Sequence, residues 1–120
     1  MKFKDDLPIY IQIMDLIKIQ IVNGEYKSGD KLLSVRDLAS NLKVNPNTIQ
    51  RAYQELELEE IVETKRGMGT FVKDDANLFS ELKNDIAKNI ISKFIIDIKP
   101  LGLSRDEIMN IVEKQISKEA

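Results

Sequence analysis

The chain has 120 residues, 42% of them hydrophobic and 32% charged, which fits one compact domain with a short appendage rather than two full domains. It contains no cysteine and no histidine, so disulfide frameworks, thiolate chemistry and most hydrolytic or zinc sites that need histidine are excluded. The formal net charge of -2 counts against a nucleic-acid binder on the simplest test, because such domains are usually basic.

The first expected element is a helix that opens at Pro8, a residue suited to a first helical turn, and stops at Asn23-Gly24. Its apolar residues at helical spacing are Ile9, Ile13, Leu16, Ile17 and Ile21. A further apolar set on its other side is Ile11, Met14, Ile19 and Val22. This is more apolar surface than one small core needs from one helix, so the pattern predicts a second partner for the helix.

A turn, a short strand and a second helix are expected next. Residues 26–30 have turn composition, and residues 31–33 are expected to form a short strand. Ser34 has the character of an N-cap, with Asp37 three residues later, for a helix over residues 35–42.

A third helix is expected after a tight connection. Asn45 is suited to cap it, and Pro46 to occupy its first position. Its predicted buried side consists of Ile49, Ala52, Tyr53 and Leu56. Two short helices in this order, the second opened by polar side chains, indicate a helix-turn-helix.

A β-hairpin is expected after this helix. Residues 61–64 and 70–73 have strand composition, and they flank Lys65-Arg66-Gly67-Met68-Gly69, whose glycines provide the backbone freedom of a hairpin tip. A hairpin at this place is the wing of a winged helix.

Two helices are expected in residues 76–120. One runs from about residue 78 to 98 and ends at Pro100 and Gly102, and Ser104-Arg105-Asp106-Glu107 has the spacing of a capping box for the other. These helices have too little core of their own, so we predict that they bury against a second copy of the chain. The predicted dimerisation residues are Leu78, Phe79, Leu82, Ile86, Ile90, Phe94, Ile108, Ile111 and Val112.

Basic residues gather around the predicted helix-turn-helix. Residues 31–54 carry Lys31, Arg36, Lys43 and Arg51 against the single acid Asp37, whereas glutamates gather at residues 55–63. One basic face and an acidic back would suit docking on a phosphate backbone.

Several polar residues have the chemistry of DNA contacts. Those in the first turns of the third helix, Pro46, Asn47, Thr48, Gln50 and Arg51, match the residue types that read base edges in the major groove. Helix capping explains asparagine and threonine there equally well, so this chemistry alone leaves the two interpretations balanced. Arg36, supported by Lys31 and Ser34, is placed to reach a phosphate, and the wing tip a minor groove, although each taken alone fits a solvated surface residue better.

The spaced segments together resemble the DNA-binding domain of the GntR family of bacterial regulators over roughly residues 8–72. They are Pro8-Ile9-Tyr10, Gly24-Glu25, Ser28-Gly29-Asp30-Lys31-Leu32, Ser34-Val35-Arg36-Asp37-Leu38-Ala39, Val44-Asn45-Pro46-Asn47-Thr48-Ile49-Gln50-Arg51-Ala52-Tyr53 and Gly67-Met68-Gly69-Thr70-Phe71-Val72. The short helical tail resembles the YtrA-like branch. The resemblance implies a repressor of an operon, often one that encodes a transporter, acting as a homodimer on an inverted-repeat operator.

The family's contact positions correspond here to Arg36, Asn45, Asn47, Thr48, Gln50, Arg51, Arg66 and Gly67. With the residues named above, the predicted DNA-binding set is Lys31, Ser34, Arg36, Asn45, Pro46, Asn47, Thr48, Gln50, Arg51, Lys65, Arg66 and Gly67. The chain departs from the family at Leu33, where a proline is usual, and at Glu60, where a glycine usually ends the recognition helix. Glu60 must therefore adopt a left-handed conformation at a cost of ~1 kcal/mol, or the helix must end differently.

We therefore expect a mainly α fold with a small β-hairpin wing: a winged helix-turn-helix over residues 1–75 and a two-helix dimerisation tail over residues 76–120. The expected partners are double-stranded operator DNA and a second copy of the chain. We expect no enzyme activity, cofactor, metal or membrane partner, and a cytoplasmic location, since the apolar runs are too short to span a bilayer and no leader opens the chain.

Two alternatives stay open. The negative net charge fits a winged helix that serves as a protein-interaction module without specific DNA binding, its acidic back being the working surface. The residues identify no small-molecule effector, and a tail that only dimerises is favoured over one that also binds an effector, because such helices enclose little cavity.

Overall fold

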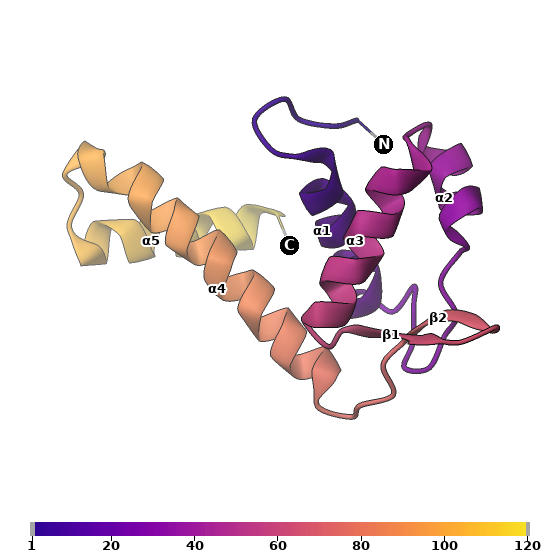
Figure 1. Cartoon of the computed structure of the whole chain (residues 1–120). Coiled ribbons are helices and arrows are strands. Elements are labelled where there is room, and N and C mark those ends of the chain that lie inside the picture. Colours follow the sequence, from indigo (N-terminus) through magenta and orange to yellow (C-terminus); the bar gives the residue numbers. More distant parts are fainter. Residues whose placement is uncertain (1, 120) are drawn as a thin grey trace. The chain divides into compact units, whose positions relative to one another are not determined.

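The computed structural model describes residues 2–119 and is mainly helical, with one two-stranded antiparallel sheet (Figure 1). Its elements are α1 (Ile9–Val22), α2 (Val35–Leu42), α3 (Pro46–Leu58), β1 (Val62–Lys65), β2 (Gly69–Val72), α4 (Leu78–Ile98), a 3-10 helix (Lys99–Leu101) and α5 (Arg105–Glu119). This is the expected winged helix with a helical tail. The chain divides into two compact units after Lys83, later than the expected boundary after residue 75, and the buried Leu82 of α4 falls in the first unit.

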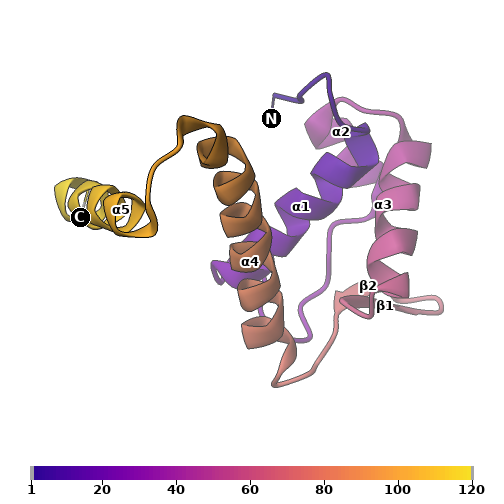
Figure 2. The same cartoon turned by 90° about the vertical axis from the view of Figure 1, so that its left-hand side faces the viewer.

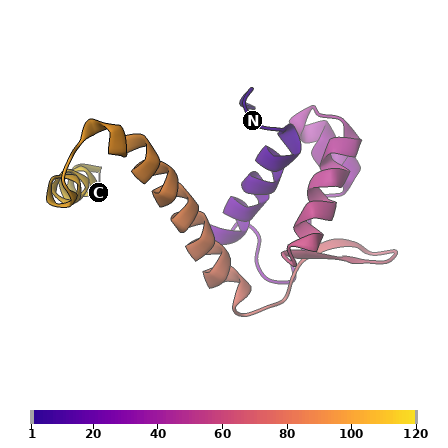
Figure 3. The ribbon, with the colours of Figure 1, turned by 60° about the vertical axis from the view of Figure 1, so that its left-hand side comes forward.

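Helix α3 is the centre of the first unit and packs against α1, α2 and β1 (Figures 1 and 3). Its buried side consists of Ile49, Ala52, Tyr53 and Leu56, as the sequence predicted. Helix α1 faces it with a stripe at helical spacing, Ile13, Ile17 and Ile21, whose side chains are at most 2% exposed. The core of the first unit is therefore built mainly by these stripes, although Ile9 of the expected α1 stripe is 41% exposed and Met14, expected on the other side of the helix, is buried.

Side-chain caps fix the starts of α2 and α3. The Asp37 N–H donates to Ser34 Oγ at 3.0 Å, and the Asn47 N–H donates to Asn45 Oδ1 at 2.8 Å, with Pro46 in the first helical position. Both caps satisfy backbone donors that would otherwise lack a partner. The predicted starts of both helices are confirmed.

Both helices end in Schellman motifs that lack the usual glycine. At the end of α3 the Glu60 N–H donates to the Glu57 carbonyl at 2.9 Å, and the Ile61 N–H donates to the Leu56 carbonyl at 3.0 Å. Glu60 has φ of 62°, and Lys43 has φ of 57° at the corresponding place after α2. Of the two outcomes expected for Glu60, the structure shows the left-handed residue.

The predicted wing is present as the antiparallel pair β1 and β2, with Val62 opposite Val72 and Lys65 opposite Gly69. The expected short strand at residues 31–33 is wrong, because this stretch makes a single bridge, Lys31 opposite Phe71. The Leu33 carbonyl instead accepts a hydrogen bond from the Tyr53 hydroxyl at 2.7 Å. Because burial raises the pKa of Tyr53 well above its usual value, this hydroxyl keeps its proton and stays a donor.

The second unit contains the rest of α4, the 3-10 helix and α5. The 3-10 helix and the residues after it form a short bend between α4 and α5 (Figure 2). The capping box at the start of α5 is confirmed: the Ser104 N–H donates to Glu107 Oε1 at 3.0 Å, and the Glu107 N–H donates to Ser104 Oγ at 3.1 Å. These bonds lower the pKa of Glu107 below its usual value, and the bond from the Ser104 backbone N–H has the largest effect. Helix α5 therefore begins where the sequence places it.

Candidate nucleic-acid interface

The start of α3 presents a polar face. Pro46, Asn47 and Gln50 are exposed, whereas Thr48 is half-buried. The side-chain oxygen of Asn45 is engaged in the cap, which leaves its amide nitrogen free of that bond. Exposed amides on the first turns of a helix are suited to the edges of adenine in the major groove.

Arg36 lies in the first turn of α2. Its side chain is exposed, and α2 packs directly on α3. Ser34 is occupied as the N-cap of α2, so it orders the helix that carries Arg36. Lys31 makes a backbone bridge to Phe71, which places it beside the wing.

Arg51 stacks on an aromatic ring of another helix. Its guanidinium carbon lies 3.9 Å from the centroid of the Tyr10 ring, within the range of a cation–π contact. Arg51 and Asn47 are one helical turn apart on α3, and both are exposed. Arg51 is thus held at the edge of the polar face.

The wing tip carries Arg66 and Gly67 in an exposed turn, and Gly67 has φ of 77°, which favours glycine. Lys65 is partly engaged within the hairpin, because its Nζ lies 4.8 Å from the Phe71 ring centroid and 3.9 Å from a Glu63 carboxylate oxygen. Arg66 is therefore the most available cation of the tip.

Several contacts fix the wing to the rest of the first unit, among them hydrogen bonds from the Leu32 N–H to the Thr70 carbonyl at 2.8 Å and from the Val72 N–H to the Asp30 carbonyl at 2.7 Å. The Thr64 N–H donates to a Glu57 carboxylate oxygen of α3 at 2.7 Å. A Cβ on Gly69 would lie 2.8 Å from Lys31 Cε, so the absence of a side chain there lets Lys31 lie across the hairpin. The bridge to Phe71 and the missing side chain at Gly69 together place Lys31 on the wing. In Figures 1 and 3, α2 and the hairpin tip lie on the same side of α3.

The tail exposes apolar side chains. Of the predicted dimerisation residues, Leu82 is buried in the single chain at 6% exposure, whereas Ile90 and Ile111 are 65% and 51% exposed. Leu78, Ile86, Ile108 and Val112 are half-buried, and Phe79 and Phe94 are exposed. Within residues 84–119 no side chain is buried.

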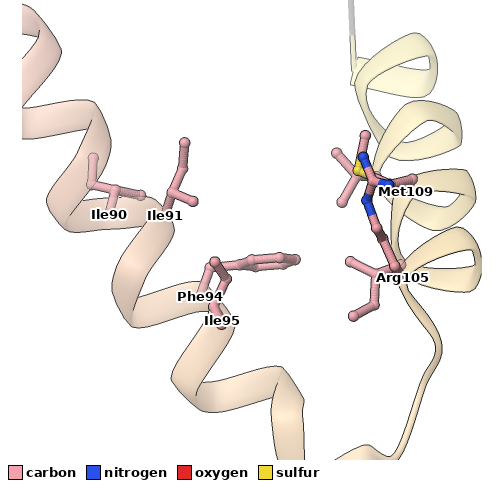
Figure 4. A pocket seen from close by; sticks show the side chains of 8 residues that line it. Ile90, Ile91, Phe94, Ile95, Arg105 and Met109 are labelled. Atoms are coloured by element: carbon pink, nitrogen blue, oxygen red, sulfur yellow. The ribbon is translucent and has the colours of Figure 1, made fainter.

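An apolar groove of about 680 Å³ lies between α4 and α5 within the second unit. Figure 4 shows Phe94 and its neighbours on α4 facing Met109 and Arg105 on α5 across an open space. The residues that line it are Ile90, Ile91, Phe94, Ile95, Arg105, Ile108, Met109 and Val112. Arg105 is the only charged one among them.

Sequence reasoning assigned no role to several of these residues. Tyr10 gave a usable signal, because an aromatic residue three positions before Ile13 continues the buried stripe of α1. Ile91 and Ile95 lie beside the stripe predicted for α4, and Met109 beside that of α5. Their part in the groove depends on how α4 and α5 meet, which periodicity does not specify.

No helix within residues 2–119 is long and apolar enough to cross a membrane. Over the same residues, acidic side chains form no cluster of three or more that could hold a metal ion.

Comparison with known proteins decides the family. The family described as bacterial regulatory proteins, gntR family, matches residues 9–72, which include α1, the helix-turn-helix and the wing. The chain belongs to the GntR family. Its members bind DNA, and this chain is a DNA-binding transcriptional regulator rather than an enzyme.

The likeness extends beyond the GntR winged helix into the tail. The HTH-type transcriptional regulator YhcF of Bacillus subtilis is 45% identical over 108 residues, covering 90% of this chain and 89% of YhcF. The HTH-type transcriptional repressor YtrA of the same organism is 39% identical over 115 residues, covering 95% of this chain and 88% of YtrA. A solved GntR family transcriptional regulator from Listeria monocytogenes has a TM-score of 0.87 at 49% identity, covering 93% of this chain and 98% of that chain. This GntR protein is therefore similar to YtrA-like regulators along nearly its whole length.

Proposed function

We propose that the chain acts as a homodimer that binds an inverted-repeat operator and represses transcription. The observation that carries the proposal is the tail, in which no side chain of residues 84–119 is buried although many are apolar. Apolar surface of this extent is unfavourable in water, and burying it contributes roughly 25 cal/mol per Å². A second copy of the tail supplies a matching apolar surface.

The open groove between α4 and α5 supports the same assembly. Ile90 on α4 and Met109 on α5 are 65% and 57% exposed, and both line the groove. Two helices that leave such a groove unfilled are suited to take helices of a partner into it, as in helix bundles. We propose the predicted dimerisation set other than Leu82, together with Ile91, Ile95 and Met109, as the dimer surface.

A symmetric dimer sets the form of the operator. Two-fold symmetry presents two copies of α3 in opposite senses, so the operator is expected to be an inverted repeat with half-sites about one helical turn apart. The proposed contacts are the predicted DNA-binding residues, with Ser34 acting as the cap of α2 and Arg36, Asn47, Gln50, Arg51 and Arg66 as the exposed side chains best suited to touch DNA. Repression is proposed because the relative YtrA is a transcriptional repressor.

Light scattering at micromolar concentration tests the dimer. We expect the wild-type protein to be a dimer, and Ile90→Asp to be a monomer because a carboxylate cannot be buried without a partner. Asn89→Asp is the matched control, since Asn89 is the exposed neighbour of Ile90 on α4 and the same carboxylate there should leave the dimer intact. A monomeric wild-type protein would contradict the proposal.

Transcription in vitro tests repression. The template carries a promoter that overlaps a duplex selected by the wild-type protein from a randomised library. We expect added protein to reduce the transcript, and Ile90→Asp to reduce it much less at equal concentration. An increase in transcript would show activation instead.

A further inference from the structure

Tyr10 lies at the rim of the contact between α1 and α3. It precedes the buried residues Ile13 and Met14 by three and four positions, so it continues the side of α1 that faces the core. Its side chain is half-buried, whereas those of Ile13 and Met14 are 0% and 7% exposed. The ring is therefore anchored by the core on one side and open on the other.

The open face of the ring carries the guanidinium of Arg51, at 3.9 Å from the ring centroid. No ion pair within residues 2–119 includes Arg51. An aromatic ring, rather than a carboxylate, thus holds this arginine in place.

The type of contact decides whether the N–H edges of the Arg51 guanidinium are free to bind a base. A carboxylate would engage the N–H edges of the guanidinium, which are the same edges that pair with guanine. A ring that stacks on the guanidinium contacts its flat face and leaves those edges free, and the distance of 3.9 Å between Arg51 Cζ and the ring centroid fits such stacking. Holding the side chain in advance also reduces the rotamer freedom that it must lose when it binds a base.

We propose that Tyr10 is a positioning residue for base readout: its ring holds Arg51 of α3 with the guanidinium edges free for the major groove, and Tyr10 itself touches no base. The proposal rests on the operator binding proposed above. It assigns to α1, which lies outside the helix-turn-helix, a part in sequence specificity.

A double-mutant cycle tests the proposal. The probe is a duplex enriched from a randomised library by the wild-type protein, and the dissociation constant is measured by fluorescence anisotropy. Tyr10→Leu keeps apolar bulk but removes the ring, and we expect it to weaken binding about two- to fivefold. Tyr10→Phe keeps the ring and should bind like the wild-type protein. In an Arg51→Ala background, Tyr10→Leu should have no further effect.

Each other result counts against a stated part of the account. An equal loss from Tyr10→Leu in both backgrounds would show that Tyr10 acts through the fold alone, and melting temperatures of the four proteins would report that directly. A loss in Tyr10→Phe as large as in Tyr10→Leu would assign the effect to the hydroxyl. If the wild-type protein enriches no duplex, operator binding itself is contradicted and the positioning role falls with it.

Discussion

Replacing Glu60 by glycine should stabilise the protein. Glu60 has φ of 62°, a conformation that costs a residue with a Cβ roughly 1–2 kcal/mol. Glycine avoids this cost but loses more conformational freedom on folding, by about 0.5–1 kcal/mol. No hydrogen bond or ion pair within residues 2–119 uses the Glu60 side chain, so its removal breaks none of these contacts. The net gain in unfolding free energy is about 1 kcal/mol.

Urea unfolding at a fixed protein concentration measures this gain. With a slope of about 2 kcal/mol per M, the midpoint should rise by roughly 0.5 M. Glu60→Ala is the matched control, because it removes the same carboxylate but keeps the Cβ and therefore the strained backbone. A Glu60→Gly midpoint no higher than that of Glu60→Ala would refute the argument from backbone strain.

Three further changes test other parts of the structure. Tyr53→Phe removes the hydrogen bond to the Leu33 carbonyl and should lower the unfolding free energy by about 1 kcal/mol; an unchanged urea midpoint would contradict a role for this bond. The Ser104 backbone N–H is the larger cause of the lowered pKa of Glu107 and the Ser104 hydroxyl the smaller, so Ser104→Ala, which removes only the hydroxyl, should move this pKa part of the way back towards its usual value in a carbon-13 NMR titration. Because the pKa of Glu107 is lowered in the folded protein, the capping box stabilises α5 fully at pH values above the ordinary glutamate pKa, and this stabilisation is lost as the pH falls through the lowered pKa. A pKa of Glu107 that Ser104→Ala leaves unchanged would contradict a contribution of the hydroxyl. Gly67→Ala should destabilise the wing by roughly 1 kcal/mol, seen as faster hydrogen exchange of the hairpin amides, since φ of 77° is unfavourable for alanine; unchanged exchange would show that the tip relaxes freely.

The sequence predicts the winged helix well because its signals are local. Asn45 caps the helix that directly follows it, and the buried stripe of α3 depends only on the helical repeat. The capping box at Ser104 is a signal of the same kind, read over four residues. The likeness to a known family supported the contact positions that the side-chain chemistry suggested and added Asn45 to them.

The features that the sequence did not predict depend on contacts between distant residues. Residues 31–33 have strand composition, but the Leu33 carbonyl accepts a hydrogen bond from the hydroxyl of Tyr53, which is twenty positions away in the sequence. The stacking of Arg51 on Tyr10 joins α3 to α1, and the periodicity of neither helix indicates it. The stripe of α4 likewise does not show that Leu82 is covered in the single chain while Ile90 is not.

Net charge was a poor guide for a related reason. The value of -2 belongs to the whole chain, whereas docking on DNA depends on the few cations that the fold brings to one side. Arg36 on α2, Arg51 on α3 and Arg66 at the wing tip are far apart in sequence, and each is exposed. In the proposed interface these three cations, and not the net charge, meet the DNA.

Selection from a randomised duplex library is the measurement that tests operator binding by this interface most directly. The wild-type protein is predicted to enrich an inverted repeat with half-sites about one helical turn apart, and its affinity for that duplex should fall steeply with salt. Arg36→Ala and Arg51→Ala should each reduce the enrichment. A library that remains random after selection with the wild-type protein, or an enrichment that both substitutions leave unchanged, would contradict the account.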